Sequence, residues 1–132
     1  MGSDGHPKYE CEIVNKNTII EGVINIDYRV KWQKYNMGTP TGNYNYLGSS
    51  KKNPNGKTYT KTVYIEPVTD EQIILWSKEA MKDAVENNRF KVQKEQTYIY
   101  GIAKNGLKFE GYRDNITNKI TTFYPVEDWR LA

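Results

Sequence analysis

The stretch from Thr69 to Asn88, TDEQIILWSKEAMKDAVENN, constrains the fold most, because its apolar residues recur at helical spacing. Thr69 and Gln72 have the spacing of a capping box, which predicts the start of the helix. Two consecutive asparagines predict its end at about Glu86. The expected apolar stripe comprises Ile73, Trp76, Ala80 and Ala84, joined by Ile74, Ser77 and Met81. We expect this stripe to pack on a sheet.

The segments on either side of this helix have the period of β-strands. Even positions from Val23 to Trp32 are apolar or aromatic and odd positions are mostly polar, which predicts a half-buried strand. Residues 57–67 predict another strand, ended by Pro67. Residues 97–103, 107–113 and 119–124 predict an antiparallel meander with a turn at Asn105 and Gly106. The predicted fold class is α+β, with this three-stranded meander packed against one main helix.

Residues 36–56 are rich in Gly, Asn, Pro and Ser, and we expect them to form a loop. Such long loops are usually functional or disordered. Tyr44 and Tyr46 stand between or beside asparagines, and Lys51, Lys52 and Lys57 follow. This pattern is typical of a surface that stacks bases and binds phosphates, and equally of a mobile hairpin tip.

Bulk properties limit the classes of protein that fit. The chain has 132 residues and a formal charge of +3, with one cysteine and one histidine. We expect a single domain over residues 8–132, after a disordered or vector-derived start at residues 1–7. A lone cysteine excludes an intrachain disulfide and a cysteine-based zinc site. No run of about 18 apolar residues, which would predict a membrane span, is found.

The residues available for catalysis indicate an anionic substrate. A single histidine argues against a serine–histidine site, and no metal-ligand spacing or glycine-rich phosphate loop is found. Lysine, arginine, threonine and tyrosine remain, and these bind and orient phosphate. On the last strand, Thr122 and Tyr124 face away from the helix if Phe123 packs on it. Tyr112 and Arg113 end the preceding strand and are expected near the same rim. The alternative is that these hydroxyls only decorate an exposed strand.

Two segments in a fixed order carry a family resemblance. GKTYTKTVYIEPVTDEQIILWSKEA is followed by FEGYRDNITNKITTFYP, and IIEGVI precedes both. Over residues 19–125 the chain resembles the bacterial EndoU nucleases, which often form the C-terminal toxic tips of polymorphic and contact-dependent inhibition (CdiA-type) toxins. The resemblance implies an EndoU-like fold of the barnase–EndoU–colicin–RelE (BECR) group.

The resemblance also implies site residues. It implies that the Thr122 hydroxyl hydrogen-bonds the scissile phosphate. It also implies that Tyr124 stacks a base or positions the phosphate. It assigns the catalytic lysine to Lys61 or Lys57, with Lys61 favoured because it lies on a strand. Asn43, Tyr44 and Asn45 occupy the family's histidine loop and are expected to bind substrate. Tyr112 and Arg113 are expected to bind substrate because of their proximity to the last strand.

The chain departs from the family pattern, because no histidine pair stands at Asn43–Asn45. Three explanations are open: a histidine-independent member of the wider BECR group, which we favour, an EndoU-like domain that lost its histidines, or a pure binding module. We therefore expect a metal-independent, cofactor-independent endoribonuclease toxin that cuts RNA, preferably tRNA, to a 2′,3′-cyclic phosphate. The alternative is a non-catalytic RNA- or protein-binding domain. The expected toxin is a monomer, is secreted within a larger protein, acts in the target-cell cytoplasm and binds an acidic immunity protein.

Overall fold

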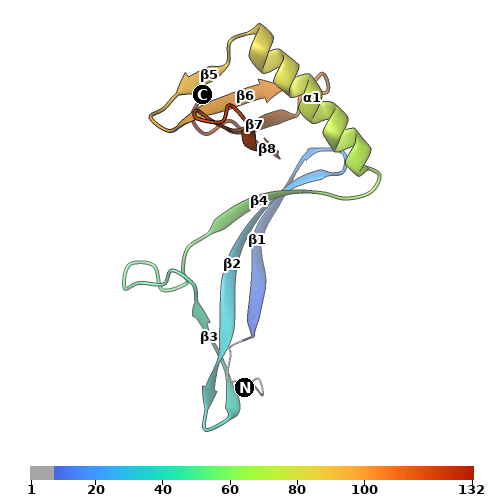
Figure 1. Ribbon diagram of the computed structural model, residues 1–132. Coiled ribbons are helices and arrows are strands. Elements are labelled where there is room, and N and C mark those ends of the chain that lie inside the picture. Colours follow the sequence, from blue (N-terminus) through green and yellow to red (C-terminus); the bar gives the residue numbers. More distant parts are fainter. Residues whose placement is uncertain (1–7) are drawn as a thin grey trace. The chain divides into compact units, whose positions relative to one another are not determined.

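The computed structural model describes residues 8–132 of the protein (Figure 1). The α+β class is confirmed, since one helix and eight strands form the regular structure of these residues. The chain divides into two compact units, which are described one at a time. Unit 1 comprises residues 8–17 and Ile26–Lys61, and unit 2 comprises Thr18–Asn25 and Thr62–Ala132. The expectation for residues 1–7 lies outside the described residues, and the single-domain assignment stays a prediction.

The first sheet has four strands in the order β1 (Tyr9–Ile20), β2 (Val23–Asn36) and β3 (Thr39–Tyr46), with β4 (Tyr59–Tyr64) also paired to β2. In unit 1, β2 and β3 form a hairpin that pairs Asn36 with Thr39. Its two turn residues, Met37 and Gly38, have φ values of 51° and 82°, which suit the twist of a tight hairpin.

The prediction of a loop over residues 36–56 is wrong for residues 39–46, which form β3. Pairing with β2 supplies main-chain hydrogen bonds that offset the low strand propensity of this Pro-, Gly- and Asn-rich segment. Pro40 is tolerated because β3 lies at the edge of the path β1-β2-β3, where a missing N–H leaves no ladder bond unmade. Strand β2 also extends beyond the predicted Trp32 to Asn36, and β1 was not predicted.

In unit 2, α1 (Asp70–Glu86) begins as the sequence predicts. The backbone N–H of Gln72 donates to the Thr69 hydroxyl at 3.2 Å, and the Gln72 side chain accepts from the Thr69 N–H at 2.9 Å. The helix ends at Asn87, and Asn88 takes the left-handed conformation with φ 53°. The apolar stripe is confirmed at Ile73, Trp76, Ala80 and Ala84, but Ile74 is 53% exposed and does not belong to it.

The helix covers one face of a four-stranded antiparallel sheet of order β5 (Phe90–Val92), β6 (Gln96–Ile102), β7 (Lys108–Asp114) and β8 (Ile120–Val126) (Figure 1). Strand β5 was not predicted. Helix and sheet touch at Gly101, where an added Cβ would lie 1.9 Å from the Ala80 carbonyl oxygen. The core between the two layers includes Leu107, Phe109 and, at its margin, Phe123.

The turn between β6 and β7 includes Asn105 and Gly106, as the sequence predicts, together with Lys104. Ala103 accepts from the Gly106 N–H at 3.0 Å and donates to the Leu107 carbonyl at 2.9 Å, so three residues, 104–106, form the turn. Gly106 has φ 90°, which only glycine adopts without strain. This turn pairs Tyr100 with Glu110 and thereby decides which side chains of β7 share a face with β6.

Candidate active site

The face of the unit 2 sheet opposite α1 gathers four tyrosines, and we call it the tyrosine face: Tyr98, Tyr100, Tyr112 and Tyr124. Strand alternation and register place them together, because Tyr98 pairs with Tyr112 and Tyr124 pairs with Glu110. The ring centroid of Tyr98 lies 5.4 Å from that of Tyr100 and 5.7 Å from that of Tyr112. Thr122 joins this face, since it pairs with Tyr112.

Glu110 is the centre of this face, and its side chain is 0% exposed. The Tyr98 hydroxyl donates to its Oε1 at 2.7 Å, and the Tyr124 hydroxyl donates to its Oε2 at 3.3 Å. The Arg130 backbone N–H donates to Oε1 at 2.9 Å, and its guanidinium Nε donates to Oε2. A buried carboxylate is tolerated only when such donors replace water, and here four of them do.

The segment that follows β8 supplies Arg130, because it folds back onto the sheet. The Trp129 indole N–H lies 3.1 Å from the Gly101 carbonyl oxygen and 3.0 Å from that of Phe109. The same indole packs edge-on against Tyr100, with centroids 5.1 Å apart. Lys108 and Asp128 form an ion pair of 2.8 Å beside it. These contacts hold residues 128 and 129 against the sheet, and they thereby position the backbone of Arg130.

The Arg130 guanidinium also reaches Tyr124, whose hydroxyl accepts from its Nη2 at 2.6 Å. Burial raises the pKa of Tyr124, and the neighbouring Glu110 carboxylate adds to that effect, while Arg130 opposes it. The phenol is therefore protonated at neutral pH and acts as a hydrogen-bond donor, not as a base. Tyr98 is even more strongly affected, since burial and its bond to Glu110 both raise its pKa.

The ionisation of Glu110 follows from its donors. Burial alone would raise the pKa of Glu110, but the bonds from the Arg130 backbone, Tyr98 and the guanidinium lower it below its usual value. The carboxylate in turn raises the pKa of Arg130. The cluster is thus a charged pair with two neutral phenols at neutral pH.

Thr122 and Tyr124 lie at the exposed margin of this face. Tyr124 is 37% exposed, and Thr122 is exposed as well. A bulge separates the pairs Tyr112–Thr122 and Arg113–Ile120, so Thr121 has no partner in the register. The Thr121 hydroxyl instead donates to the Tyr112 carbonyl at 3.2 Å. Both residues are therefore exposed on the same face of the sheet, where a ligand can reach them.

Sequence reasoning missed Glu110, Arg130 and Tyr98 as members of this cluster. The signal that could have found Glu110 is its position two residues before Tyr112 in the strand alternation, which puts an acid on the same face as an aromatic residue. Arg130 had no such signal, because no periodic pattern covers residues 127–132.

The structure places Tyr112 and Arg113, both predicted to bind substrate, on different faces. Tyr112 lies on the tyrosine face beside Tyr98. The guanidinium carbon of Arg113 lies 5.9 Å from the ring centroid of Phe90, which pairs with Ile99 and shares its face. Alternation along β7 therefore directs Arg113 away from Thr122 and Tyr124.

The other predicted site residues belong to unit 1. Lys61 is exposed on β4, and the Lys57 ammonium lies 5.2 Å from the ring centroid of Tyr59. Asn43, Tyr44 and Asn45 lie on β3, with Tyr44 opposite Gln33 and Asn45 opposite Trp32. The Lys31 ammonium lies 4.1 Å from the Tyr44 ring centroid, so this tyrosine sits beside a cation. Their roles in substrate binding and catalysis stay predictions.

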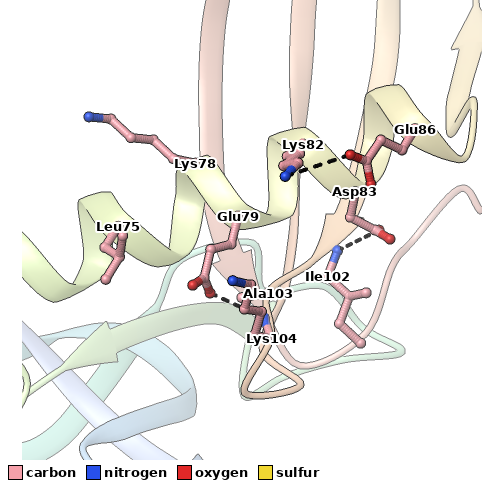
Figure 2. Close-up of a pocket in the computed structure, with 9 residues that line it drawn as sticks. All are labelled: Leu75, Lys78, Glu79, Lys82, Asp83, Glu86, Ile102, Ala103 and Lys104. Carbon is pink, nitrogen blue, oxygen red and sulfur yellow. Dashed lines mark hydrogen bonds and ion pairs between the residues drawn. The ribbon is translucent and has the colours of Figure 1, made fainter.

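An open groove of about 480 Å³ lies between α1 and the β6–β7 turn, on the helix side of the sheet (Figure 2). Its carboxylates are engaged within the protein: Glu79 accepts from the Lys104 N–H at 3.2 Å, and Asp83 from the Ile102 N–H at 3.0 Å. Glu86 pairs with Lys82 at 3.8 Å. The groove therefore offers less unused chemistry than the tyrosine face.

Residues 8–132 were also considered for metal binding and for membrane-spanning helices. Within them, no group of three or more His, Cys, Asp or Glu side chains has a geometry that would hold a metal ion. Among the same residues, no helix has the length and apolar character needed to cross a membrane.

Comparison with known proteins identifies one family. The comparisons with curated proteins and with solved structures each found no significant match. A family model described as bacterial EndoU nuclease matches residues 8–127, which include β8 with Thr122 and Tyr124. The match covers most of the chain, and the protein belongs to the bacterial EndoU nuclease family.

Proposed function

We propose that the protein is a metal-independent endoribonuclease whose active site includes Thr122 and Tyr124 on the tyrosine face. The observation that carries the proposal is Tyr124, an exposed residue whose hydroxyl is held by Arg130 at 2.6 Å and by Glu110 at 3.3 Å, two residues after an exposed threonine. Membership of a nuclease family supports the assignment. The bond to Glu110 is long, so the phenol exchanges it readily for a phosphate oxygen.

RNA supplies its own nucleophile for this reaction. The 2′-oxygen attacks the adjacent phosphorus and the bond from phosphorus to the 5′-oxygen breaks, which yields a 2′,3′-cyclic phosphate and a 5′-hydroxyl. Water takes the proton of the 2′-hydroxyl and returns one to the departing oxygen. The enzyme's part is orientation and charge stabilisation, with Thr122 and Tyr124 donating hydrogen bonds to the phosphate. A histidine pair is not required for those roles.

Lys61 and Lys57 remain the candidates for a catalytic lysine that the resemblance implies. A lysine ammonium would add positive charge at the phosphate. Lys61→Ala should lower cleavage more than Lys57→Ala, since Lys61 lies on a strand and Lys57 in a connection.

The toxin role is part of the same proposal. The domain would form the tip of a larger secreted protein of the contact-dependent inhibition type, reach the target-cell cytoplasm as a monomer and cut tRNA there. An acidic immunity protein would neutralise it in the producing cell, in keeping with the net charge of +3.

The proposal is tested with the purified protein and a short RNA in the presence of EDTA. The wild type should leave 2′,3′-cyclic phosphate ends and spare a strand with 2′-deoxyribose at the cleavage site. Tyr124→Phe should lower kcat by about 100-fold, because one donor to the developing charge is lost. Tyr64→Phe is the matched control, since it also removes a phenol that is hydrogen-bonded to a carboxylate, Asp70, at 2.6 Å.

Induction inside a bacterium tests the toxin role. The wild type should arrest growth with tRNA fragments visible on a gel, and Tyr124→Phe should do neither. Salt-dependent RNA binding without cleavage by the folded wild type would instead support a non-catalytic RNA-binding domain. Equal cleavage by the wild type and Tyr124→Phe would overturn the assignment of the site.

A further inference from the structure

Arg130 and Glu110 form an ion pair whose two side chains differ strongly in solvent exposure. The Arg130 side chain is 60% exposed, whereas that of Glu110 is 0% exposed. The guanidinium uses Nε for Glu110 and Nη2 for Tyr124. It therefore bridges a buried anchor and an exposed phenol, with its outer edge toward solvent.

We propose that Arg130 is a catalytic residue that contacts the scissile phosphate, and that Glu110 is the positioning residue that fixes its guanidinium beside Tyr124. This inference rests on the proposed ribonuclease function. It goes beyond the family assignment, because the matched residues end at 127 and Arg130 lies after them.

The geometry places the cation where the reaction needs it. A phosphate oxygen that accepts a hydrogen bond from the Tyr124 hydroxyl lies next to the nitrogen that already donates to that hydroxyl at 2.6 Å. Guanidinium is planar and permanently charged, and it binds two phosphate oxygens at once. It would stabilise the negative charge that grows on the phosphorane oxygens, and it moves no proton.

Glu110 does not need the whole guanidinium for its own solvation. Its Oε1 already accepts from the Tyr98 hydroxyl at 2.7 Å and from the Arg130 backbone N–H at 2.9 Å. The guanidinium shares only Oε2, so most of its donors remain available to a ligand. A carboxylate that orients an arginine in this way pre-organises it before substrate binds.

The anchoring of the segment around Arg130 supports the same role. The indole of Trp129 donates to Gly101 and Phe109, and Asp128 pairs with Lys108 at 2.8 Å. The backbone of Arg130 is itself bonded to Glu110 at 2.9 Å. An arginine on a flexible segment would lose entropy when it engaged a phosphate, and these contacts reduce that loss.

The test measures kcat and KM for cleavage of a short RNA by Arg130→Gln, Arg130→Lys and the wild type. Arg130→Gln should lower kcat by about 100-fold to 1,000-fold with a smaller change in KM, since the contact strengthens in the transition state. Arg130→Lys should have a kcat between those of the wild type and Arg130→Gln, because lysine keeps the positive charge but cannot bind two phosphate oxygens in one plane. Equal kcat in all three proteins overturns the proposal.

Arg130→Gln leaves Glu110 buried and charged without its cationic partner, which lowers the stability of the fold. The double variant Glu110→Gln/Arg130→Gln removes both charges, so it keeps a folded protein available. It should be as inactive as Arg130→Gln. Lys78→Gln on α1 removes an exposed positive charge on the other side of the sheet from the tyrosine face, and this matched control should cleave RNA like the wild type. A loss in Lys78→Gln equal to that in Arg130→Gln assigns the effect to net charge and overturns a phosphate contact.

A second readout separates this proposal from the proposed function. Affinity for a 2′-O-methyl RNA, which cannot be cleaved, is measured against salt concentration. Arg130→Gln should lower the slope of log affinity against log salt by about 0.7, the value for one phosphate contact on a single strand. If the wild type cuts no RNA, the proposed ribonuclease function is wrong. The salt dependence of affinity still tests whether Arg130 contacts a phosphate. An unchanged slope overturns the contact whether or not RNA is cut.

Discussion

At the scale of single residues, Glu110 links the stability of unit 2 to pH. Its pKa in the folded protein lies below its usual value of 4.5, because hydrogen bonds from Arg130 and Tyr98 outweigh its burial. A lowered folded pKa means that the unfolded chain binds more protons, so stability rises with pH in that range. The stabilisation is present above about pH 4.5 and is lost as the pH falls through the folded pKa.

We expect Glu110→Gln to flatten the dependence of unfolding free energy on pH below about pH 5, where a carboxylate with a lowered folded pKa becomes protonated. Urea unfolding at several pH values measures this dependence. Glu71→Gln, an exposed change of the same charge on α1, is the control. Curves for the wild type and Glu110→Gln that run parallel over the whole range would contradict the linkage.

At the scale of elements, the start of α1 depends on Thr69. Its hydroxyl accepts from the Gln72 N–H at 3.2 Å, which satisfies one of the unpaired donors of the first turn. Thr69→Ala should lower the free energy of unfolding by about 1 kcal/mol. Thr69→Ser should have a free energy of unfolding close to that of the wild type, because serine also caps the helix. Urea unfolding of both variants checks this, and an equal loss in serine and alanine would contradict a role for the hydroxyl.

Elements with strong local signals could be predicted from the sequence, and α1 with its caps is the best example. The alternation of β8 also placed Thr122 and Tyr124 opposite Phe123, which packs at the margin of the core as expected. Strand β3 could not be predicted, because its residues have weak strand propensity and only pairing with β2 makes it a strand.

The cluster around Glu110 depends on a register that local sequence does not determine. A two-residue turn at Asn105 and Gly106 would shift the β6–β7 pairing by one residue and put Tyr98 on the same face as Phe109. The three-residue turn instead pairs Tyr98 with Tyr112 and Tyr100 with Glu110. Arg130 reaches the site through the packing of Trp129, which is a tertiary contact without a local signal.

At the scale of the whole molecule, the charge is divided unevenly between the units. The described residues of unit 1 include nine Lys or Arg and three Asp or Glu, whereas those of unit 2 include ten and twelve. Unit 1 also has seven Tyr or Trp side chains among those residues, and Tyr44 lies beside the Lys31 ammonium. Positive charge interleaved with aromatic rings is the composition that binds single-stranded RNA.

We therefore predict that unit 1 makes most of the sequence-independent contacts to RNA phosphates. Lys51→Gln/Lys52→Gln, in the exposed connection between β3 and β4, should lower the salt slope of RNA affinity by up to about 1.4, two contacts of about 0.7 each. Lys78→Gln/Lys104→Gln removes two exposed lysines of unit 2 on the helix side of its sheet, away from the tyrosine face, and is the matched control. Both double variants lose the same net charge, so a general effect of charge would lower both slopes equally and contradict the prediction. A larger drop for the unit 1 variant would mean that affinity depends on where the lysines lie, because counterions are released only where lysines meet phosphates.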